Sequence, residues 1–278
     1  MRYALRVTRK MLKILFLGDI NGKIGREAIK KLLPQLKRQL KPDLVVANAE
    51  NAAHGTGVNV ASLKELMEAG VDWFTSGDHA FDKEKQLNEC LEHALPIIRP
   101  ANFPPQISGH GYALISARGH RILLINLVGR VFMDKNYDCP FRKLNEILAQ
   151  FDLANEKLSA IIIDMHAEAT SEKAAFGHYA DGKVSAVLGT HTHVMTADEK
   201  ITEKGMAYIS DAGMVGAADE CIGVEKEEII KMFLTQIKYP HVIPEKGLAV
   251  LNGVLVTINS KTAKATEIKR IIKYVEIK

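Results

Sequence analysis

Cysteine is scarce in this sequence, and long apolar runs are missing from it. The three cysteines, Cys90, Cys139 and Cys221, are odd in number and far apart. This spacing argues against a disulfide framework or a metal finger and favours a reducing compartment. No apolar run approaches the roughly 18 residues that a membrane span needs. We therefore expect a cytoplasmic protein without a membrane partner.

A large excess of one charge sign is also missing. The formal net charge is only +4 over 278 residues, and the basic residues are spread along the chain. Strong binding to nucleic acid is therefore not expected, whereas small anionic substrates remain open. The contents of 47% hydrophobic and 25% charged residues are ordinary for a soluble globular protein with a sizeable core.

The N-terminal segment lacks the features of a secretory signal. Its apolar run LKILFL is too short for one, and no small-residue cleavage site follows. We expect a buried first strand there, which makes residues 1–10 an N-terminal extension and Met11 an alternative start. No linker rich in proline, glycine or serine divides the remainder, so we predict a single domain over residues 11–278.

Short apolar runs alternate with helical patterns along the chain, which predicts an α/β fold of two packed sheets flanked by helices. Strand pairs are expected in residues 111–130, around a turn at 117–119, and in a hairpin over 253–274. Pro34 predicts a kink or a short second helix. Buried strands are expected at 13–17, 43–48, 72–77, 159–166, 184–191 and 206–211, and helices at 26–40, 60–70 and 141–151.

Five of the predicted strands end in side chains of the kinds that bind metals. Any one of them alone is more typical of a turn or a helix cap. Ligand sites in open α/β sheets form beyond the carboxyl ends of the strands, so the five together predict a site at one rim. The residues are Asp19, Glu50 with Asn51, Asp78 with His79, His166, and His191 with His193.

His191 and His193 are separated by a single threonine. On an extended chain such a pair lies on one face, which would suit a shared metal ion.

The predicted donors are oxygen and nitrogen atoms without a thiolate, which favour iron, manganese or zinc. The donors exceed what one tetrahedral metal takes, so two metals are expected. A pair about 3.5–4 Å apart, bridged by one carboxylate, suits phosphate-ester hydrolysis.

The segment GDINGKIGR has a superficial similarity to the phosphate-binding loop of nucleotide triphosphatases. The spacing from Gly18 to Gly22 is one residue short, and Ile24 stands where that loop requires serine or threonine. A glycine-rich turn that carries Asp19 explains the segment better.

The order of these motifs resembles the calcineurin-like metallophosphoesterase superfamily. The segments FLGDINGKIGR, NAENAAHGTG, RPANFP, DMHAEATSEK and GTHTHVMTAD are similar to its bacterial 2′,3′-cyclic-nucleotide phosphodiesterase branch. The resemblance implies a four-layer α/β/β/α sandwich with two mixed sheets. It also implies a metal-dependent phosphoric diester hydrolase with two metal ions, iron before manganese or zinc, a small phosphodiester substrate such as a cyclic nucleotide, and a homo-oligomer.

The resemblance also implies how the ligands divide between the two metals, with Glu50 as the bridge. A hydroxide between the metals would attack phosphorus, and His79 beside them would protonate the leaving ribose oxygen. Asp19, Glu50, Asn51 and His193 would hold one metal, and Glu50, Asp78, His166 and His191 the other.

Further residues are candidates for substrate contact. Asn21 and His54, which lies in the glycine-rich loop near Glu50, are expected to bind substrate. Arg26 is either a phosphate ligand or the solvent-facing start of a helix. For His178 we favour surface exposure over a place at the rim.

Asp78 departs from the family pattern, which has asparagine at this position. Aspartate also binds metals, but a third carboxylate beside Asp19 and Glu50 should raise the pKa of bound water and repel phosphate. We therefore expect reduced phosphodiesterase activity or a shifted metal preference. Two alternatives stay open, namely a phosphomonoesterase or phosphoprotein phosphatase, and a metal-binding regulatory module with weak catalysis.

Overall fold

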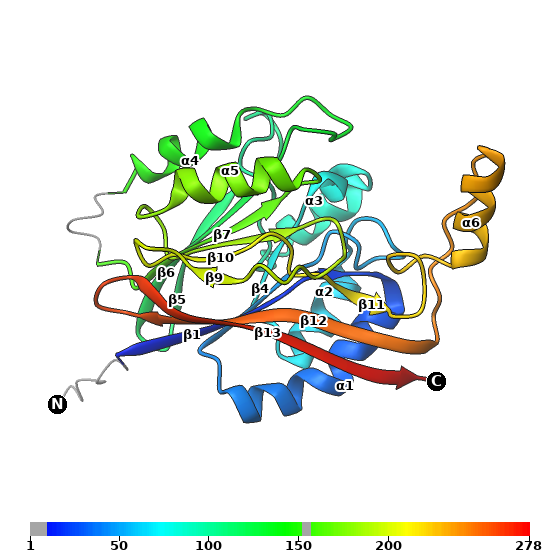
Figure 1. The fold of residues 1–278 in the computed structure, drawn as a ribbon, viewed down its shortest axis with the longest axis horizontal. Coiled ribbons are helices and arrows are strands. Elements are labelled where there is room, and N and C mark those ends of the chain that lie inside the picture. Colours follow the sequence, from blue (N-terminus) through cyan, green and yellow to red (C-terminus); the bar gives the residue numbers. More distant parts are fainter. Residues whose placement is uncertain (1–9, 152–156) are drawn as a thin grey trace.

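The computed structural model of the protein describes residues 10–151 and 157–278. Two β-sheets lie face to face between two layers of helices (Figure 1). The first sheet contains β1 (Met11–Leu17), β2 (Asp19–Ile20), β3 (Leu44–Asn48), β4 (Trp73–Thr75), β11 (Met214–Ala217), β12 (Gly247–Asn259) and β13 (Lys264–Ile277). The second contains β5 (Tyr112–Ala117), β6 (His120–Val128), β7 (Ala160–His166), β8 (Ala186–Thr190), β9 (Lys200–Ile201) and β10 (Ala207–Ile209).

Both sheets mix parallel and antiparallel neighbours. The first has the order β2-β11-β12-β1-β3-β4, with β13 paired to β12, and its β1, β3 and β4 are parallel. The second has the order β5-β6-β7-β8-β10-β9, and its four inner strands are parallel. In each sheet the carboxyl ends of the parallel strands therefore meet at one edge, where a site can form.

Helices cover the outer face of each sheet. Three of them, α1 (Gly22–Leu40), α2 (Val60–Ala69) and α3 (Glu84–Glu92), pack on the first sheet, whereas α4 (Pro140–Leu148) and α5 (Thr170–Ala180) pack on the second. Successive side chains of β1 alternate between the two faces of their sheet. Leu15 and Leu17 join the core beneath the helices, and Ile14 and Phe16 join the core between the sheets. The predicted four-layer α/β/β/α sandwich is thus confirmed.

The predicted strands all form, but three helices were not predicted. These are α3, α5 and α6 (Lys226–Thr235). Pro34 lies inside α1, which continues as one helix to Leu40, so the short second helix does not form. The extension expected over residues 1–10 falls, apart from Lys10, outside the described residues, and the single domain stays a prediction.

The three cysteines form no disulfide bond in the structure. Cys90, Cys139 and Cys221 are all free thiols. In the described part of the chain, no helix combines the length and the apolarity that crossing a bilayer requires.

Candidate metal centre

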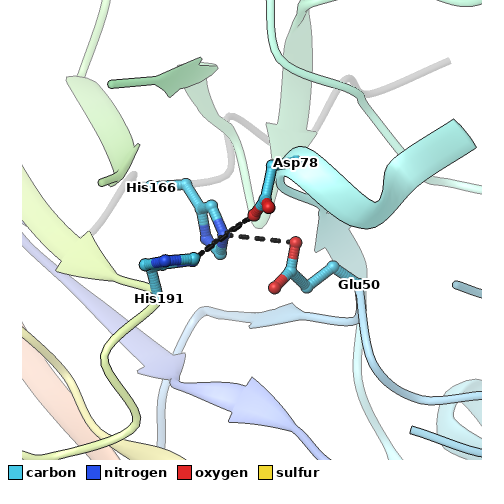
Figure 2. A group of neighbouring side chains, drawn as sticks. All are labelled: Glu50, Asp78, His166 and His191. Carbon is cyan, nitrogen blue, oxygen red and sulfur yellow. Dashed lines mark hydrogen bonds and ion pairs between the residues drawn. The ribbon is translucent and has the colours of Figure 1, made fainter. Parts of the chain in front are cut away.

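Four side chains from the two sheets converge at the carboxyl ends of the strands. Glu50 follows β3, Asp78 begins a single turn of 3₁₀ helix after β4, His166 ends β7, and His191 follows β8. One ligand atom of each lies within 4.8 Å of those of the other three (Figure 2). We call these four residues the cluster.

The donor atoms of the cluster have the spacing of ligands around one metal ion. His166 Nε2 lies 2.9 Å from Asp78 Oδ1 and 3.2 Å from Glu50 Oε2. His191 Nδ1 lies 3.0 Å from His166 Nε2. Ligands about 2.0–2.2 Å from a metal are roughly 3 Å from one another. The cluster therefore fits a cation, which would also relieve the repulsion between two facing imidazole nitrogens.

The backbone of Gly77 lies directly against two ligands of the cluster, Glu50 and His166. A Cβ atom at this position would lie 2.0 Å from Glu50 Oε2 and 2.3 Å from His166 Nε2. Any side chain here would collide with the ligands, so the cluster requires glycine at this position.

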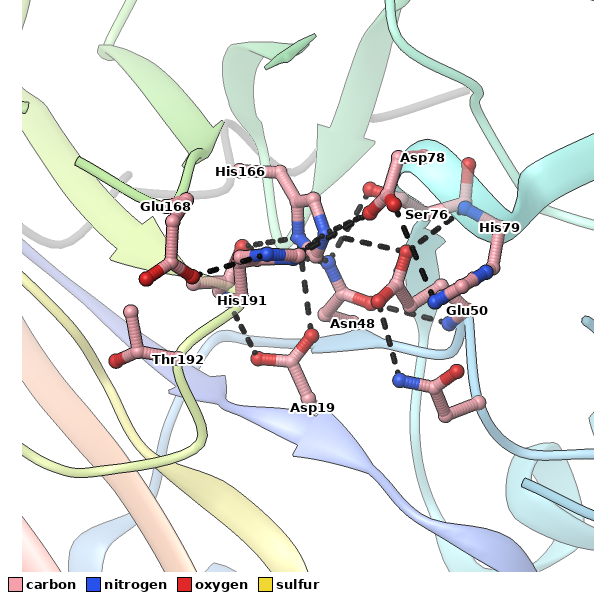
Figure 3. Close-up of polar contacts among 12 residues, drawn as sticks. Asp19, Asn48, Glu50, Ser76, Asp78, His79, His166, Glu168, His191 and Thr192 are labelled. Atoms are coloured by element: carbon pink, nitrogen blue, oxygen red, sulfur yellow. Dashed lines mark hydrogen bonds and ion pairs between the residues drawn. The ribbon is translucent and has the colours of Figure 1, made fainter. Parts of the chain in front are cut away.

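Each imidazole of the site has its second nitrogen held by an oxygen. His191 Nε2 lies 3.3 Å from Glu168 Oε2 (Figure 3). His166 Nδ1 lies 2.8 Å from Thr190 Oγ1. His193 Nδ1 lies 2.8 Å from the carbonyl oxygen of Ile222. Such partners are typical of metal-binding histidines, because they fix the ring and the tautomer. The remaining nitrogens are thereby free to bind an ion.

A buried polar network lies behind the cluster and joins the two sheets. Asp164 Oδ1 accepts a hydrogen bond from Thr190 Oγ1 at 2.6 Å. Its Oδ2 accepts from Thr75 Oγ1 at 2.5 Å and from Asn48 Nδ2 at 3.0 Å. Burial raises the pKa of Asp164 to about 7, although the nearby imidazole and hydroxyls lower it. Asn48 Oδ1 also accepts from the backbone N–H of Glu50, so the network positions ligands from both sheets.

Asp19, Asn51 and His193, which we call the outer group, lie next to the cluster. Asn51 contacts Glu50 and His193, and Asp19 Oδ1 lies 3.7 Å from Nδ1 of His166. Glu50 Oε2 faces the cluster, whereas its Oε1 accepts a 3.0 Å hydrogen bond from Asn51 Nδ2. Asn51 Nδ2 also lies 3.4 Å from His193 Nε2. Asp19 Oδ1 and Asn51 Oδ1 are buried without a hydrogen-bond partner among the described residues. Unpaired buried oxygens are costly, so they fit a second cation, although their role as ligands stays a prediction.

The site concentrates buried charge. Burial lowers the pKa of His166, but Glu50, Asp78 and Asp19 outweigh that effect and raise it well above its ordinary value. Burial opposes the ionisation of Asp78, but hydrogen bonds with His166 and His191 hold its pKa below the ordinary value. Carboxylates packed this closely are stabilised by positive charge, whether it comes from protons or from metal ions.

His79 lies beside the cluster with its ring oriented by a carboxylate. Its Nδ1 lies 2.6 Å from Asp82 Oδ2, and its Nε2 lies 3.9 Å from Asp78 Oδ2. Burial lowers the pKa of His79, but Glu50, Asp78 and Asp82 together raise it above the ordinary value. The side chain is 38% exposed, so His79 can hold a proton while still reaching solvent.

His191 and His193 do not lie on an extended strand, so that prediction was wrong. The strand β8 ends before them, and their φ angles of 102° and 65° are in the left-handed region. Two buried carboxylates hold this bend: Asp19 accepts from the backbone N–H of His191 at 3.1 Å, and Asp211 accepts from that of Thr192 at 3.0 Å. The bend sends one ring to the cluster and the other to the outer group.

The other predicted substrate residues divide between the site and the surface. Asn21 and His54 line a cavity of about 500 Å³ that also contains Glu50, His79 and both histidines of the bend. The guanidinium of Arg26 is hydrogen-bonded to Glu65 and to a backbone carbonyl, and it does not line the cavity. His178 is exposed on α5, away from this cavity.

Several residues that orient the site were missed from the sequence. They are Asp82, Asp164, Glu168 and Thr190. Asp164 carried a usable signal, since a carboxylate inside the apolar run AIIIDMH must find partners when it is buried. Asp82 stands three residues after His79, a spacing that brings two side chains together on a helical turn.

Comparison with known proteins gives a consistent result. Residues 15–271 match the family model described as YmdB-like protein. The chain is 43% identical over 261 residues to a 2′,3′-cyclic-nucleotide 2′-phosphodiesterase of Bacillus subtilis (strain 168), which covers 94% of this chain and 97% of that protein. A crystal structure described as a novel phosphatase of Mycoplasma pneumoniae is 35% identical with a TM-score of 0.88, covering 96% of this chain and 95% of that one.

A more distant structure shares the fold. The calcineurin-like phosphoesterase YfkN from Bacillus subtilis is 12% identical and has a TM-score of 0.57, covering 95% of this chain and 90% of that one. The resemblance seen in the sequence motifs is thus confirmed. With its four-layer calcineurin-like fold and a family match over most of its length, this chain belongs to the YmdB-like family.

Proposed function

We propose that this protein is a metal-dependent phosphodiesterase that opens nucleoside 2′,3′-cyclic phosphates. One metal ion would be held by the cluster and a second by Glu50 with the outer group. The observation that carries the proposal is the cluster itself, in which two carboxylates and two imidazoles direct donor atoms at one point. The description of the Bacillus subtilis relative as a 2′,3′-cyclic-nucleotide 2′-phosphodiesterase supports the substrate class.

The chain supplies the site with oriented donors. When bound, metal ions supply Lewis acidity toward the phosphate and lower the pKa of water. Glu50 turns one oxygen to each group of ligands, which suits it as the bridge. Donors of oxygen and nitrogen without sulfur favour iron, manganese or zinc.

His79 supplies the proton for the leaving group. Asp82 orients the ring through Nδ1, which leaves Nε2 directed at the side of Asp78. The acidic side chains around His79 favour its protonated form. An imidazolium at this position can protonate the ribose oxygen as its bond to phosphorus breaks.

Phosphomonoester hydrolysis is the second candidate function. The Mycoplasma pneumoniae relative is described as a phosphatase, and the same donors would hold a phosphomonoester. A metal-binding module with weak catalysis is the third, because Asp78 adds negative charge where phosphate must bind.

The test pairs metal analysis with a substrate panel on one preparation. Metals per chain are measured by plasma mass spectrometry. Rates are measured on adenosine 2′,3′-cyclic phosphate, bis-p-nitrophenyl phosphate and p-nitrophenyl phosphate. We expect two metals per chain and faster turnover of diesters than of the monoester. A faster monoester would favour the phosphatase, two metals without turnover would favour the regulatory module, and no metal would contradict the cluster assignment.

His79→Ala separates the proton donor from the metal ligands. We expect both metals to remain and turnover of the cyclic nucleotide to fall about 10²–10⁴-fold, the usual contribution of general acid catalysis. Bis-p-nitrophenyl phosphate should lose less, because p-nitrophenolate leaves without a proton. Loss of metal from the variant, or equal losses on both diesters, would contradict the role.

A further inference from the structure

The connection from β11 to β12, residues 218–246, projects from the body of the molecule. It contains α6, drawn in orange in Figure 1, in which no residue is buried. We call this connection the arm. Phe233 and Leu234 on α6 are 77% and 80% exposed. Neighbouring apolar side chains at such exposure indicate a surface that binds something.

The base of the arm is fixed to the candidate metal centre. The carbonyl oxygen of Ile222 lies 2.8 Å from Nδ1 of His193, in the outer group. Ile243, at the other end of the arm, packs against two glycines of the active-site loops. A Cβ atom would lie 2.8 Å from Ile243 at Gly22 and 2.0 Å from it at Gly55. The arm is therefore held at a defined place beside the site.

The cavity of about 500 Å³ extends from the cluster to the arm. On the arm side its wall is mostly apolar, with His241 as a polar member. It includes Ile229, Met232 and Phe233 of α6, whereas Ile230 and Leu234 do not line it. Positions three and four apart share one face of a helix, so one face of α6 is turned to the cavity. Its volume is in the range of small-molecule sites.

One residue that lines this space also carries a buried polar atom without a hydrogen-bond partner in the described part of the chain. Asn21 lines the cavity and is 2% exposed, and its Oδ1 makes no hydrogen bond within residues 10–151 and 157–278. A buried, unpaired carboxamide oxygen is costly unless a ligand satisfies it. The cavity thus has the features of a built binding site between the cluster and the arm.

We propose that the apolar wall of the arm binds the nucleobase of a substrate whose cyclic phosphate lies at the cluster. This proposal rests on the proposed function and adds a subsite to it. A base has two apolar faces, which pack well against the ring of Phe233 and the thioether of Met232. Stacking tolerates every base because each has a π-face. The subsite therefore selects for the presence of a base and discriminates weakly among bases.

A second copy of the chain is the competing occupant, and it predicts a different pattern. A partner that covered α6 would also contact Ile230 and Leu234, which are 52% and 80% exposed away from the cavity. A nucleobase inside the cavity contacts only the face with Ile229, Met232 and Phe233. Adjacent residues on α6 thus provide a variant and its matched control.

The experiment compares Phe233→Ser with Leu234→Ser on two cyclic phosphates. One is adenosine 2′,3′-cyclic phosphate, and the other is methyl ribofuranoside 2′,3′-cyclic phosphate, which has no base. We expect the wild type to favour the nucleoside in kcat/KM by at least about tenfold, the size of one stacking contact. Phe233→Ser should lose most of this ratio, mainly through KM, whereas Leu234→Ser should keep it.

Binding measured by calorimetry gives a readout that does not depend on turnover. The ligands are adenosine 3′-monophosphate and inorganic phosphate, with the metal-loaded protein. Phe233→Ser should weaken binding of the nucleotide about tenfold relative to that of phosphate, and Leu234→Ser should not.

Three results would overturn the subsite: a wild type without preference for the base, nucleotide binding insensitive to Phe233→Ser, or equal losses in both serine variants. Equal losses together with a change in sedimentation would assign the arm to a second copy of the chain. If no diester is hydrolysed at all, the proposed function fails, and the calorimetry alone decides on the subsite.

Discussion

The cluster and the outer group differ in how far their ligands are already assembled. In the cluster the donor atoms of Asp78, His166 and His191 lie 2.9–3.3 Å apart. In the outer group the amide nitrogen of Asn51, which does not bind metals, faces Glu50 Oε1 and His193 Nε2 at 3.0 and 3.4 Å. Its oxygen and Asp19 Oδ1 are buried without a hydrogen-bond partner in the described part of the chain. An assembled set of donors loses less freedom on binding an ion. We therefore expect the cluster to bind its ion more tightly and the outer group to exchange its ion more readily.

Glu50→Ala should abolish the difference in metal affinity between the cluster and the outer group, because Glu50 contributes one oxygen to each of them. Metal ions contribute several kcal/mol of transition-state stabilisation, so turnover should fall by at least about 10³-fold. Metal analysis should find both ions depleted. A variant that kept one tightly bound metal would contradict the bridging role.

Thr190→Val should weaken the cluster while leaving the outer group intact. Thr190 joins His166 Nδ1 to Asp164, and loss of such a partner typically costs about 10–100-fold in metal affinity. Titration with a chelator, followed by metal analysis, measures the affinity of each site. Thr190→Ser keeps the hydroxyl and is the control, which should retain the native affinity. Equal affinities in the valine and serine variants would show that the network has no role in holding the ion.

Asp78→Asn should have the smallest effect on turnover of these substitutions, and it tests the charge of the cluster alone. It removes one negative charge from the cluster and none from the outer group. One unit charge at about 4 Å is worth about 1 kcal/mol in a water-like medium, so turnover at saturating metal should rise about fivefold. The measurement is kcat with metal in excess, since asparagine is the weaker ligand. A fall in kcat under these conditions would show that the charge argument is wrong.

Most of the framework could be predicted from the sequence, because each buried strand is an apolar run that ends in a polar residue. The run AIIIDMH predicts both the strand β7 and His166 at its end. The helix α6 was missed, since it packs no face on the core and has no buried stripe to detect. The bend at His191 and His193 was missed for another reason. It depends on Asp19 and Asp211, which stand 172 and 19 residues away in sequence from the backbone N–H groups that they bind.

The ligand types were likewise easier to predict than the residues that orient them. Carboxylates and imidazoles at strand ends are conspicuous, whereas Thr75 and Thr190 are ordinary residues of β-strands. Their hydroxyls matter because Asp164 is buried between them, which only the packing of the two sheets reveals. The groups that position ligands therefore depend on tertiary contacts that no local pattern encodes.

The origin of the ligands has a consequence for folding. Glu50 and Asp78 follow strands of the first sheet, and His166 and His191 belong to strand ends of the second. An ion bound by all four is a cross-link between two halves of the chain, in a protein whose three cysteines are all free. A ligand that binds only the folded state at a hundred times its Kd adds about 2.7 kcal/mol of stability. The resistance of this fold to unfolding would then rise with the supply of metal, as that of a secreted protein depends on the redox state of its surroundings.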